Sequence, residues 1–135
     1  MAKQTFVDSP YKSFPAAVHA NLVGMEGYAV EMIPGTNTIQ LYTATAGRPP
    51  LGWLFERLEG DVNWSVRLIG KGGTVRTVAG DATIGQAPAA VSIAAGGAMT
   101  ACASGGNAQG LKISPPGPDA AGDVLEIVDG FFIAP

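Results

Sequence analysis

The clearest pattern of hydrophobic and polar positions lies mid-chain, in three short β-prone runs. In the central run, residues 62–69, apolar and polar residues alternate over seven positions, with one break at the last residue. A period of two buries one face of a strand and leaves the other mostly polar. Similar runs span residues 51–58 and 74–79, and glycine-rich turns at 59–61 and 70–73 separate the three. Short strands joined by such turns predict a β-meander, with a hairpin turn at 70–73.

The same pattern of short β-prone runs separated by turns extends toward both ends of the chain. Turn signals recur about every eight to twelve residues, as in sandwiches and small barrels. No amphipathic segment with a period of 3.6 is long enough to predict a helix of more than about three turns. The sequence therefore predicts an all-β domain over residues 25–135, a small barrel or a sandwich. Beyond the meander, the expected strands are 28–32, 38–43, 88–93, 98–102, 110–113, 123–128 and 130–133.

Residues 1–24 differ from the rest because they show little periodicity. They carry three aromatic residues, Phe6, Tyr11 and Phe14, spaced among serines and prolines. We interpret this segment as an extended N-terminal arm that docks on a partner or a neighbouring subunit, with the strand pattern starting only at Gly27. The alternative is an arm that folds back over its own domain.

Composition narrows the functional classes. The chain has 135 residues, which favours one domain, and only 14% are charged, against about 25% in a typical soluble domain. Either other subunits cover part of the surface, or the domain is compact and rich in alanine and glycine. The net charge of −3 and the scattered cations argue against nucleic acid and anionic membranes as partners. The N-terminus lacks the apolar core of a secretory signal, which favours synthesis and use without export.

The residues that carry chemistry are sparse. The chain has one cysteine, Cys102, and one histidine, His19, in distant segments, so neither a thiolate metal cluster nor a nucleophile–base pair is expected. The sequence Gly70-Lys71-Gly72-Gly73 resembles part of a phosphate loop, but Ser65 stands where that loop needs its first glycine. We expect no enzymatic activity, no cofactor and no metal. Three Gly-Asp pairs, at 60–61, 80–81 and 122–123, are interpreted as turn formers.

Residues 50–128 resemble the small decoration or cement proteins of tailed-phage capsids. The resemblance rests on LFERLEGDVNWSVRLIGKGGTVRTV, on the small-residue run with Gly96-Gly97-Ala98-Met99, and on the late strand that begins Ala121-Gly122-Asp123. It implies a β-barrel or β-tulip core, a homotrimer, and a place on the exterior of a mature phage head after synthesis in the host cytoplasm. The implied partners are the major capsid protein and other copies of the chain.

Six aromatic residues are the candidate contact residues. We assign Phe6, Tyr11 and Phe14 to the capsid contact, and Trp53, Phe55 and Trp64 to subunit or core packing, with the core favoured for Trp64. An alternative function is a carbohydrate- or host-surface-binding module, in which Trp53, Tyr28 and Tyr42 offer aromatic platforms. A third, a trimeric nucleotide hydrolase, lacks a suitable constellation of phosphate loop and aspartate.

Overall fold

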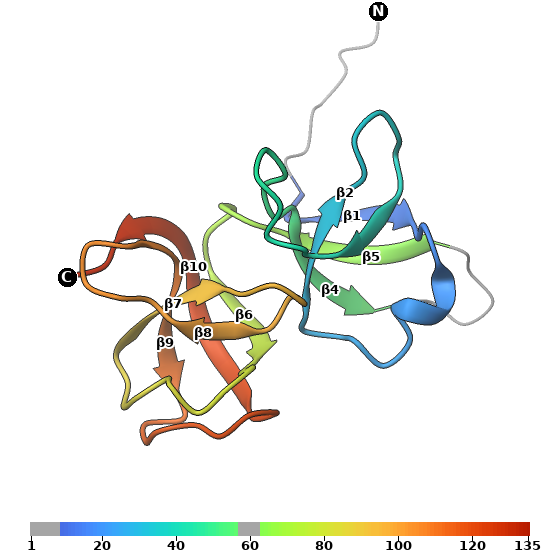
Figure 1. Ribbon diagram of the computed structural model, residues 1–135. Coiled ribbons are helices and arrows are strands. Elements are labelled where there is room, and N and C mark those ends of the chain that lie inside the picture. The colour runs from blue at the N-terminus through green and yellow to red at the C-terminus, as the bar shows by residue number, and fades with distance from the viewer. Residues whose placement is uncertain (1–8, 57–62) are drawn as a thin grey trace, which may run out of the picture.

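The computed structural model describes residues 9–56 and 63–135, which form two antiparallel five-stranded sheets (Figure 1). Each sheet is built from one half of the chain, because the first five strands make the first sheet and the last five make the second. Neither sheet closes into a barrel. The all-β prediction is confirmed, and of the architectures considered the structure corresponds to packed sheets rather than a closed barrel.

The first sheet has the strand order β1-β5-β4-β2-β3. Its strands are β1 (Tyr11–Pro15), β2 (Ala29–Met32), β3 (Ile39–Leu41), β4 (Gly52–Glu56) and β5 (Asn63–Leu68). The second sheet has the order β6-β10-β9-β7-β8. Its strands are β6 (Thr74–Val78), β7 (Ala89–Ile93), β8 (Met99–Ala101), β9 (Asn107–Ser114) and β10 (Val124–Ile133). The described residues contain no α-helix, only the 3-10 turn η1 (His19–Asn21).

Two apolar clusters hold the fold together, one on each face of the first sheet. Alternation along β4 sends Trp53 toward the second sheet and Leu54 to the opposite face. The outer cluster also contains Phe14, Leu22, Val30, Ile39, Trp64 and Val66. The cluster between the sheets joins Ala29 and Trp53 to Val75, Ala79, Ile84, Val91, Ile93, Met99, Leu125 and Ile127. The strictly alternating β5 fits this design, because Trp64 and Val66 enter the outer cluster while Arg67 faces the junction.

The turn at residues 70–73 is not the hairpin that the sequence predicts. It carries the chain from β5 in the first sheet to β6 in the second, where β6 pairs with β10. Gly70, Gly72 and Gly73 all have positive φ, of 80°, 77° and 73°. These conformations favour glycine, and they turn the chain away from its own sheet. The expected β-meander therefore ends after β5.

The strand pattern begins earlier than Gly27, which corrects a second expectation. Residues 11–15 form β1, which pairs with β5 so that Phe14 lies opposite Trp64. Phe14 is 8% exposed and Leu22 is 1% exposed, so both belong to the core of the first sheet. Pro10 precedes this short strand and Pro15 is its last residue, and the two prolines conceal its pattern in the sequence. Residues 1–8 and 57–62 lie outside the described residues.

Candidate functional site

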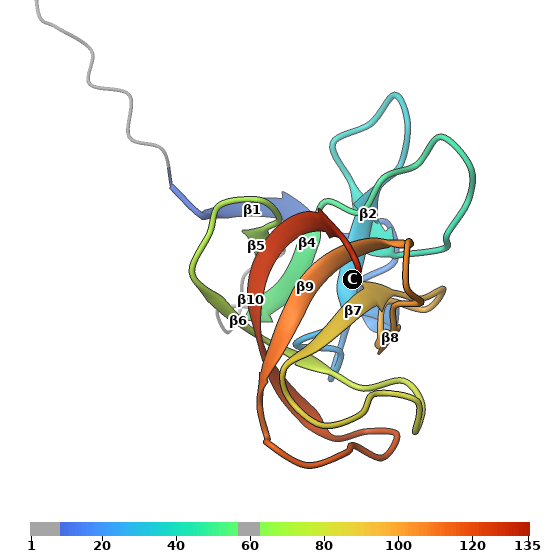
Figure 2. The same ribbon diagram turned by 90° about the vertical axis from the view of Figure 1, so that its left-hand side faces the viewer.

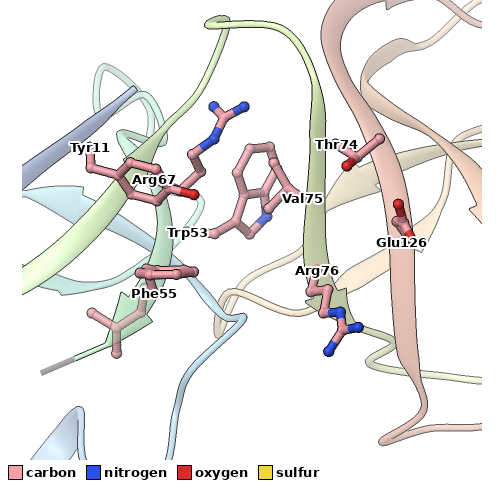
Figure 3. Close-up of a pocket in the computed structure, with 9 residues that line it drawn as sticks. Tyr11, Trp53, Phe55, Arg67, Thr74, Val75, Arg76 and Glu126 are labelled. Atoms are coloured by element: carbon pink, nitrogen blue, oxygen red, sulfur yellow. The ribbon is translucent and has the colours of Figure 1, made fainter. Parts of the chain in front are cut away.

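A cleft of about 250 Å³ opens where the edge of the second sheet meets the first sheet (Figure 3). Strands β1, β4 and β5 form one wall, and β6 and β10 form the other. The lining residues are Tyr11, Trp53, Leu54, Phe55, Arg67, Thr74, Val75, Arg76 and Glu126.

The first wall is a row of side chains set by strand register. Tyr11 pairs with Arg67 across β1 and β5, and Arg67 pairs with Trp53 across β5 and β4. Directly opposed residues in antiparallel strands point to the same face, so all three side chains lie on the side of the second sheet. The guanidinium carbon of Arg67 lies 5.9 Å from the centroid of the Tyr11 ring, within range of a cation–π contact.

Phe55 reaches the cleft because β4 contains a bulge. Leu54 pairs with Val66 and Glu56 pairs with Ser65, so Phe55 is the extra residue between them. A bulge of this kind re-aims a side chain. The rings of Phe55 and Tyr11 lie 4.8 Å apart at an interplanar angle of 51°. Phe55 is 48% exposed and Tyr11 is 42% exposed, so the pair offers aromatic surface at the mouth of the cleft.

Trp53 forms the deep end of the first wall. The residue is 1% exposed, and none of the described residues accepts a hydrogen bond from its Nε1. Figure 3 shows the indole nitrogen on the side of the ring that faces the space between Phe55 and Arg76. A buried donor without an acceptor is uncommon, because leaving it unpaired costs about 1–3 kcal/mol. The indole of Trp53 is therefore the strongest single indication of a binding site in this cleft.

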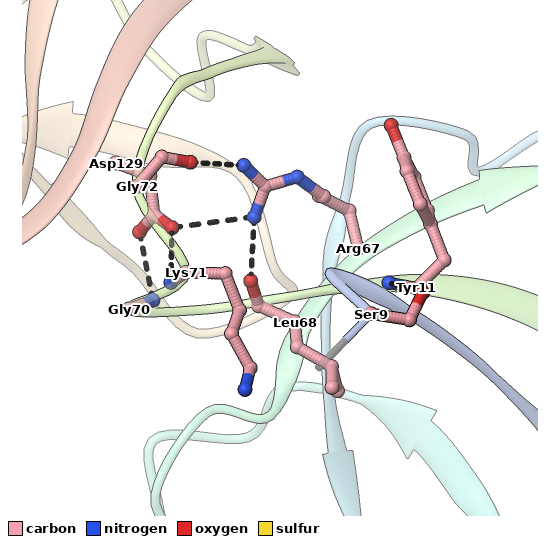
Figure 4. Close-up of polar contacts among 8 residues, drawn as sticks. All are labelled: Ser9, Tyr11, Arg67, Leu68, Gly70, Lys71, Gly72 and Asp129. Carbon is pink, nitrogen blue, oxygen red and sulfur yellow. Dashed lines mark hydrogen bonds and ion pairs between the residues drawn. The ribbon is translucent and has the colours of Figure 1, made fainter. Parts of the chain in front are cut away.

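An ion pair between the sheets holds the floor of the cleft (Figure 4). The Arg67 Nη1 atom lies 3.4 Å from Oδ2 of Asp129 on β10, and it also donates to the carbonyl of Leu68 at 2.8 Å. The backbone N–H groups of Gly70 and Lys71 donate to the same carboxylate, each at 3.0 Å. The guanidinium of Arg67 is therefore neutralised and fixed, which in turn fixes its position under the Tyr11 ring.

The second wall carries one cation and one anion. Arg76 on β6 pairs in register with Glu126 on β10, and Thr74 adds a hydroxyl group on the same strand as Arg76. Opposite charges directly across a strand pair compensate each other. The cleft as a whole thus combines aromatic surface, several donors and a carboxylate acceptor, without a net charge of its own.

A second surface lies on the outer face of the second sheet. Val124, Val128, Phe131 and Ile133 on β10 and Ile113 on β9 are 39–63% exposed. We call these five residues the β9–β10 apolar row; Figure 2 shows both strands in front of the first sheet. Sequence reasoning missed this row as a surface. Seven of the ten residues in 124–133 are apolar, in place of a strict alternation, which is the available signal that both faces of the strand contain hydrophobic residues.

The structure divides the six predicted contact residues into two groups. Tyr11, Phe55 and Trp53 come together at the cleft, although they had been assigned different roles. Phe14 and Trp64 are buried in the outer cluster, where Phe14 is covered and is not part of the exposed surface of this chain. Phe6 lies outside the described residues. The 1% exposure of Trp53 also removes it as an open platform for a sugar ring, although its edge reaches the cleft.

The aspartates that follow glycine behave as turn formers where the structure describes them. The Asp81 carboxylate accepts hydrogen bonds from the hydroxyls of Thr83 at 2.5 Å and Thr100 at 2.8 Å, and from the Thr83 backbone. These bonds hold the pKa of Asp81 below its ordinary value. Asp123 accepts a bond from the Ala120 backbone at 2.8 Å. The pair at 60–61 lies outside the described residues.

Within residues 9–56 and 63–135, no group of three or more His, Cys, Asp or Glu side chains is placed to hold a metal ion. His19 instead accepts a hydrogen bond from Nε1 of Trp64 at 3.3 Å. No helix in the described part of the chain is long and apolar enough to cross a membrane. The sequence matches no protein-family model and no curated protein.

Proposed function

We propose that this protein is a structural component of a phage particle, a decoration or cement protein that binds the exterior of the mature head and stabilises it. The resemblance of residues 50–128 to that class supports the proposal. The structural observation that supports it is the β9–β10 apolar row, five exposed apolar side chains on two paired strands. In this proposal the protein is not an enzyme, and its partners are the major capsid protein and other copies of itself.

The exposure of the apolar row favours a protein partner. Phe131 and Ile133 are each 63% exposed, and Val124 is 61% exposed. Single exposed hydrophobic residues are common, but several gathered on two paired strands are typical of interaction sites. Burial of apolar surface is the dominant favourable term in most protein–protein association, so a partner that covers this row would gain affinity from it. We assign the row to the contact with the shell protein.

Self-association would strengthen binding to the shell even if each single contact is weak. A homotrimer presents three copies of the row, and linked contacts gain avidity when the shell subunits match their spacing. Binding to the mature lattice alone stabilises it by about 2.7 kcal/mol per site at a hundredfold excess over Kd. Preference for the mature head over its precursor requires only a difference in affinity between the two lattices. Low charge in the chain is consistent with extensive contacts among subunits.

The test uses purified mature capsids that lack the protein. Wild-type protein should co-sediment with them and raise their thermal stability, whereas Val128→Asp and Phe131→Asp should bind at least about tenfold more weakly, because each introduces a charge into the contact. Val18→Asp is the matched control, since Val18 is 54% exposed but lies outside the row. Failure of the wild-type protein to bind any capsid of its own phage would overturn the proposal. Equal binding by all three variants would move the contact to another face.

A further inference from the structure

The cleft contains an unused hydrogen-bond donor in an otherwise well-paired site. Trp53 is 1% exposed and its Nε1 has no acceptor among the described residues. By contrast, Arg67, on the same wall, donates to Leu68, Gly72 and Asp129. Because buried polar groups are normally paired, the free donor indicates an acceptor that binds from outside the chain.

The charges of the cleft favour a neutral ligand over an anion. Asp129 neutralises Arg67, and Glu126 lies across from Arg76. A carboxylate or phosphate in the cleft would be attracted by Arg76 but repelled by the Glu126 carboxylate on the neighbouring strand, and the repulsion would offset part of the attraction. A neutral ligand that carries both donors and acceptors has no such conflict, because its hydroxyl groups can accept from Arg76 and donate to Glu126.

We propose that this cleft binds one residue of a neutral carbohydrate. A pyranose ring combines an apolar C–H face with hydroxyl groups around its rim. Phe55 and Tyr11 supply apolar ring surface at the mouth of the cleft, and the Trp53 indole N–H supplies a buried donor. The volume of about 250 Å³ lies just below the range typical of drug-sized pockets, which fits a single sugar residue rather than a long chain.

Each residue has a distinct role in this site. Phe55, raised by the bulge in β4, contacts the apolar face of the sugar. Trp53 donates to a ring hydroxyl, and Arg76 and Glu126 bind neighbouring hydroxyls from the second wall. Arg67 is a positioning residue, because it holds the Tyr11 ring from 5.9 Å while its own hydrogen bonds go to the protein.

This site is independent of the proposed capsid contact. The lining of the cleft shares no residue with the β9–β10 apolar row, although strand register places Thr74, Arg76 and Glu126 on the same face of the second sheet as Val124 and Val128. The isolated protein should therefore bind sugar without a capsid, and loss of one activity leaves the other measurable. A decorated particle would then display carbohydrate sites in many copies.

The two tryptophans make a direct test possible by NMR. The chain has two tryptophans, so its spectrum contains two indole N–H signals, those of Trp53 and Trp64. The indole N–H of Trp64 already donates a hydrogen bond to His19. The full-length protein is titrated with methyl glycosides of neutral hexoses and N-acetylhexosamines up to about 10 mM, about ten times a dissociation constant of 1 mM. At least one should shift the Trp53 signal in a saturable manner and leave the Trp64 signal in place. Acetate and methyl phosphate are titrated in the same way, as anionic ligands for comparison.

Variants of the lining residues test whether the shift of the Trp53 signal reports binding in the cleft. Phe55→Ala and Glu126→Gln should each weaken binding about tenfold, as should Trp53→Phe, which keeps the ring and removes the donor. Sugar binding by the Trp53→Phe and Glu126→Gln variants is followed through the backbone amide signals of β6. Val18→Ala is the control, an exposed apolar residue outside both the cleft and the β9–β10 apolar row, and should bind normally. The inference is overturned if no neutral glycoside shifts the Trp53 signal, if only the anions do, or if the Phe55 and Glu126 variants bind like the wild type.

Discussion

Arg67 and Asp129 join the two sheets, with Nη1 and Oδ2 only 3.4 Å apart although the residues are 62 positions apart in the chain. Both side chains are almost fully buried, at 8% and 0% exposure. The Asp129 carboxylate also accepts the backbone N–H groups of Gly70 and Lys71 in the crossover turn. This pair therefore fixes three things together: the packing of the sheets, the path of the turn and the floor of the cleft.

Removal of one partner should destabilise the protein strongly. Asp129→Ala leaves a buried guanidinium and two backbone donors without their acceptor, and we expect a loss of about 3–5 kcal/mol in the free energy of unfolding. Denaturant titration measures it. The double variant Arg67→Met with Asp129→Leu should lose less than the sum of the single variants, because it leaves no unpaired charge. Additive losses would show that the ion pair does not couple the sheets.

The close approach of Gly97 to the first sheet gives a second prediction, which tests the packing of the two sheets at Ala29. A Cβ atom at Gly97 would lie 2.4 Å from the carbonyl oxygen of Ala29, and φ there is +91°. Gly96 has nearly the same φ, +92°, but open space around its Cβ position. Gly97→Ala should therefore lower the melting temperature much more than Gly96→Ala, which carries only the backbone strain of about 1–2 kcal/mol. Similar melting temperatures for the two variants would mean that the sheets can separate here at little cost.

Local pattern was enough to predict most strands but not their partners. The alternation in β5 correctly predicted one buried face around Trp64, because burial on one side imposes a period of two. Pairing depends on contacts far apart in the chain. Nothing local distinguishes a hairpin at residues 70–73 from a crossover whose direction is set by the Asp129 carboxylate from β10.

The cleft was beyond sequence reasoning for the same reason. Tyr11, Trp53 and Phe55 were each selected as aromatic residues, but only the register of β1, β5 and β4 brings them together. The bulge at Phe55 has no clear sequence signal, and the pairing of Arg76 with Glu126 depends on strands 50 positions apart in the sequence. The apolar row was more accessible, since the long hydrophobic run of β10 is visible in the chain.

The N-terminal strand gives a third prediction. Phe14 lies opposite Trp64 and is buried in the outer cluster with Leu22. Phe14→Ala should cost about 3–5 kcal/mol of unfolding free energy because it leaves a cavity beside the Trp64 ring. Tyr11→Ala on the same strand is the matched control, since Tyr11 is 42% exposed, and it should cost much less.

Deletion of the same region extends the test. Removal of residues 1–24 takes away β1 and Leu22 and exposes Trp64 and Val66, so we expect loss of cooperative unfolding or aggregation. A truncated protein with an unchanged melting curve would contradict the role of β1 and restore a separate N-terminal arm.

Glu31 gives the fourth prediction, a dependence of stability on pH. Its carboxylate is fully buried, and it accepts hydrogen bonds from the Thr43 backbone at 2.6 Å, the Thr43 hydroxyl at 2.8 Å and Gln40 at 3.1 Å. Burial acts to raise the pKa of Glu31, but the bonds from Thr43 and Gln40 and the charge of Arg48 at 3.7 Å together outweigh it and hold the pKa below its ordinary value of 4.5.

A carboxyl group whose pKa falls on folding stabilises the protein fully above its unfolded value, and this contribution is lost as the pH falls from 4.5 through the folded pKa. Glu31→Gln should therefore be less stable than the wild type at neutral pH, and its unfolding free energy should fall less steeply below pH 4.5. Thr43→Val, which removes one donor, should have an intermediate slope. Thr36→Val makes the same chemical change in the turn between β2 and β3, and should shift stability equally at every pH. Urea titrations across this pH range measure the slopes, and parallel curves for wild type and Glu31→Gln would show that this carboxylate carries no acid sensitivity.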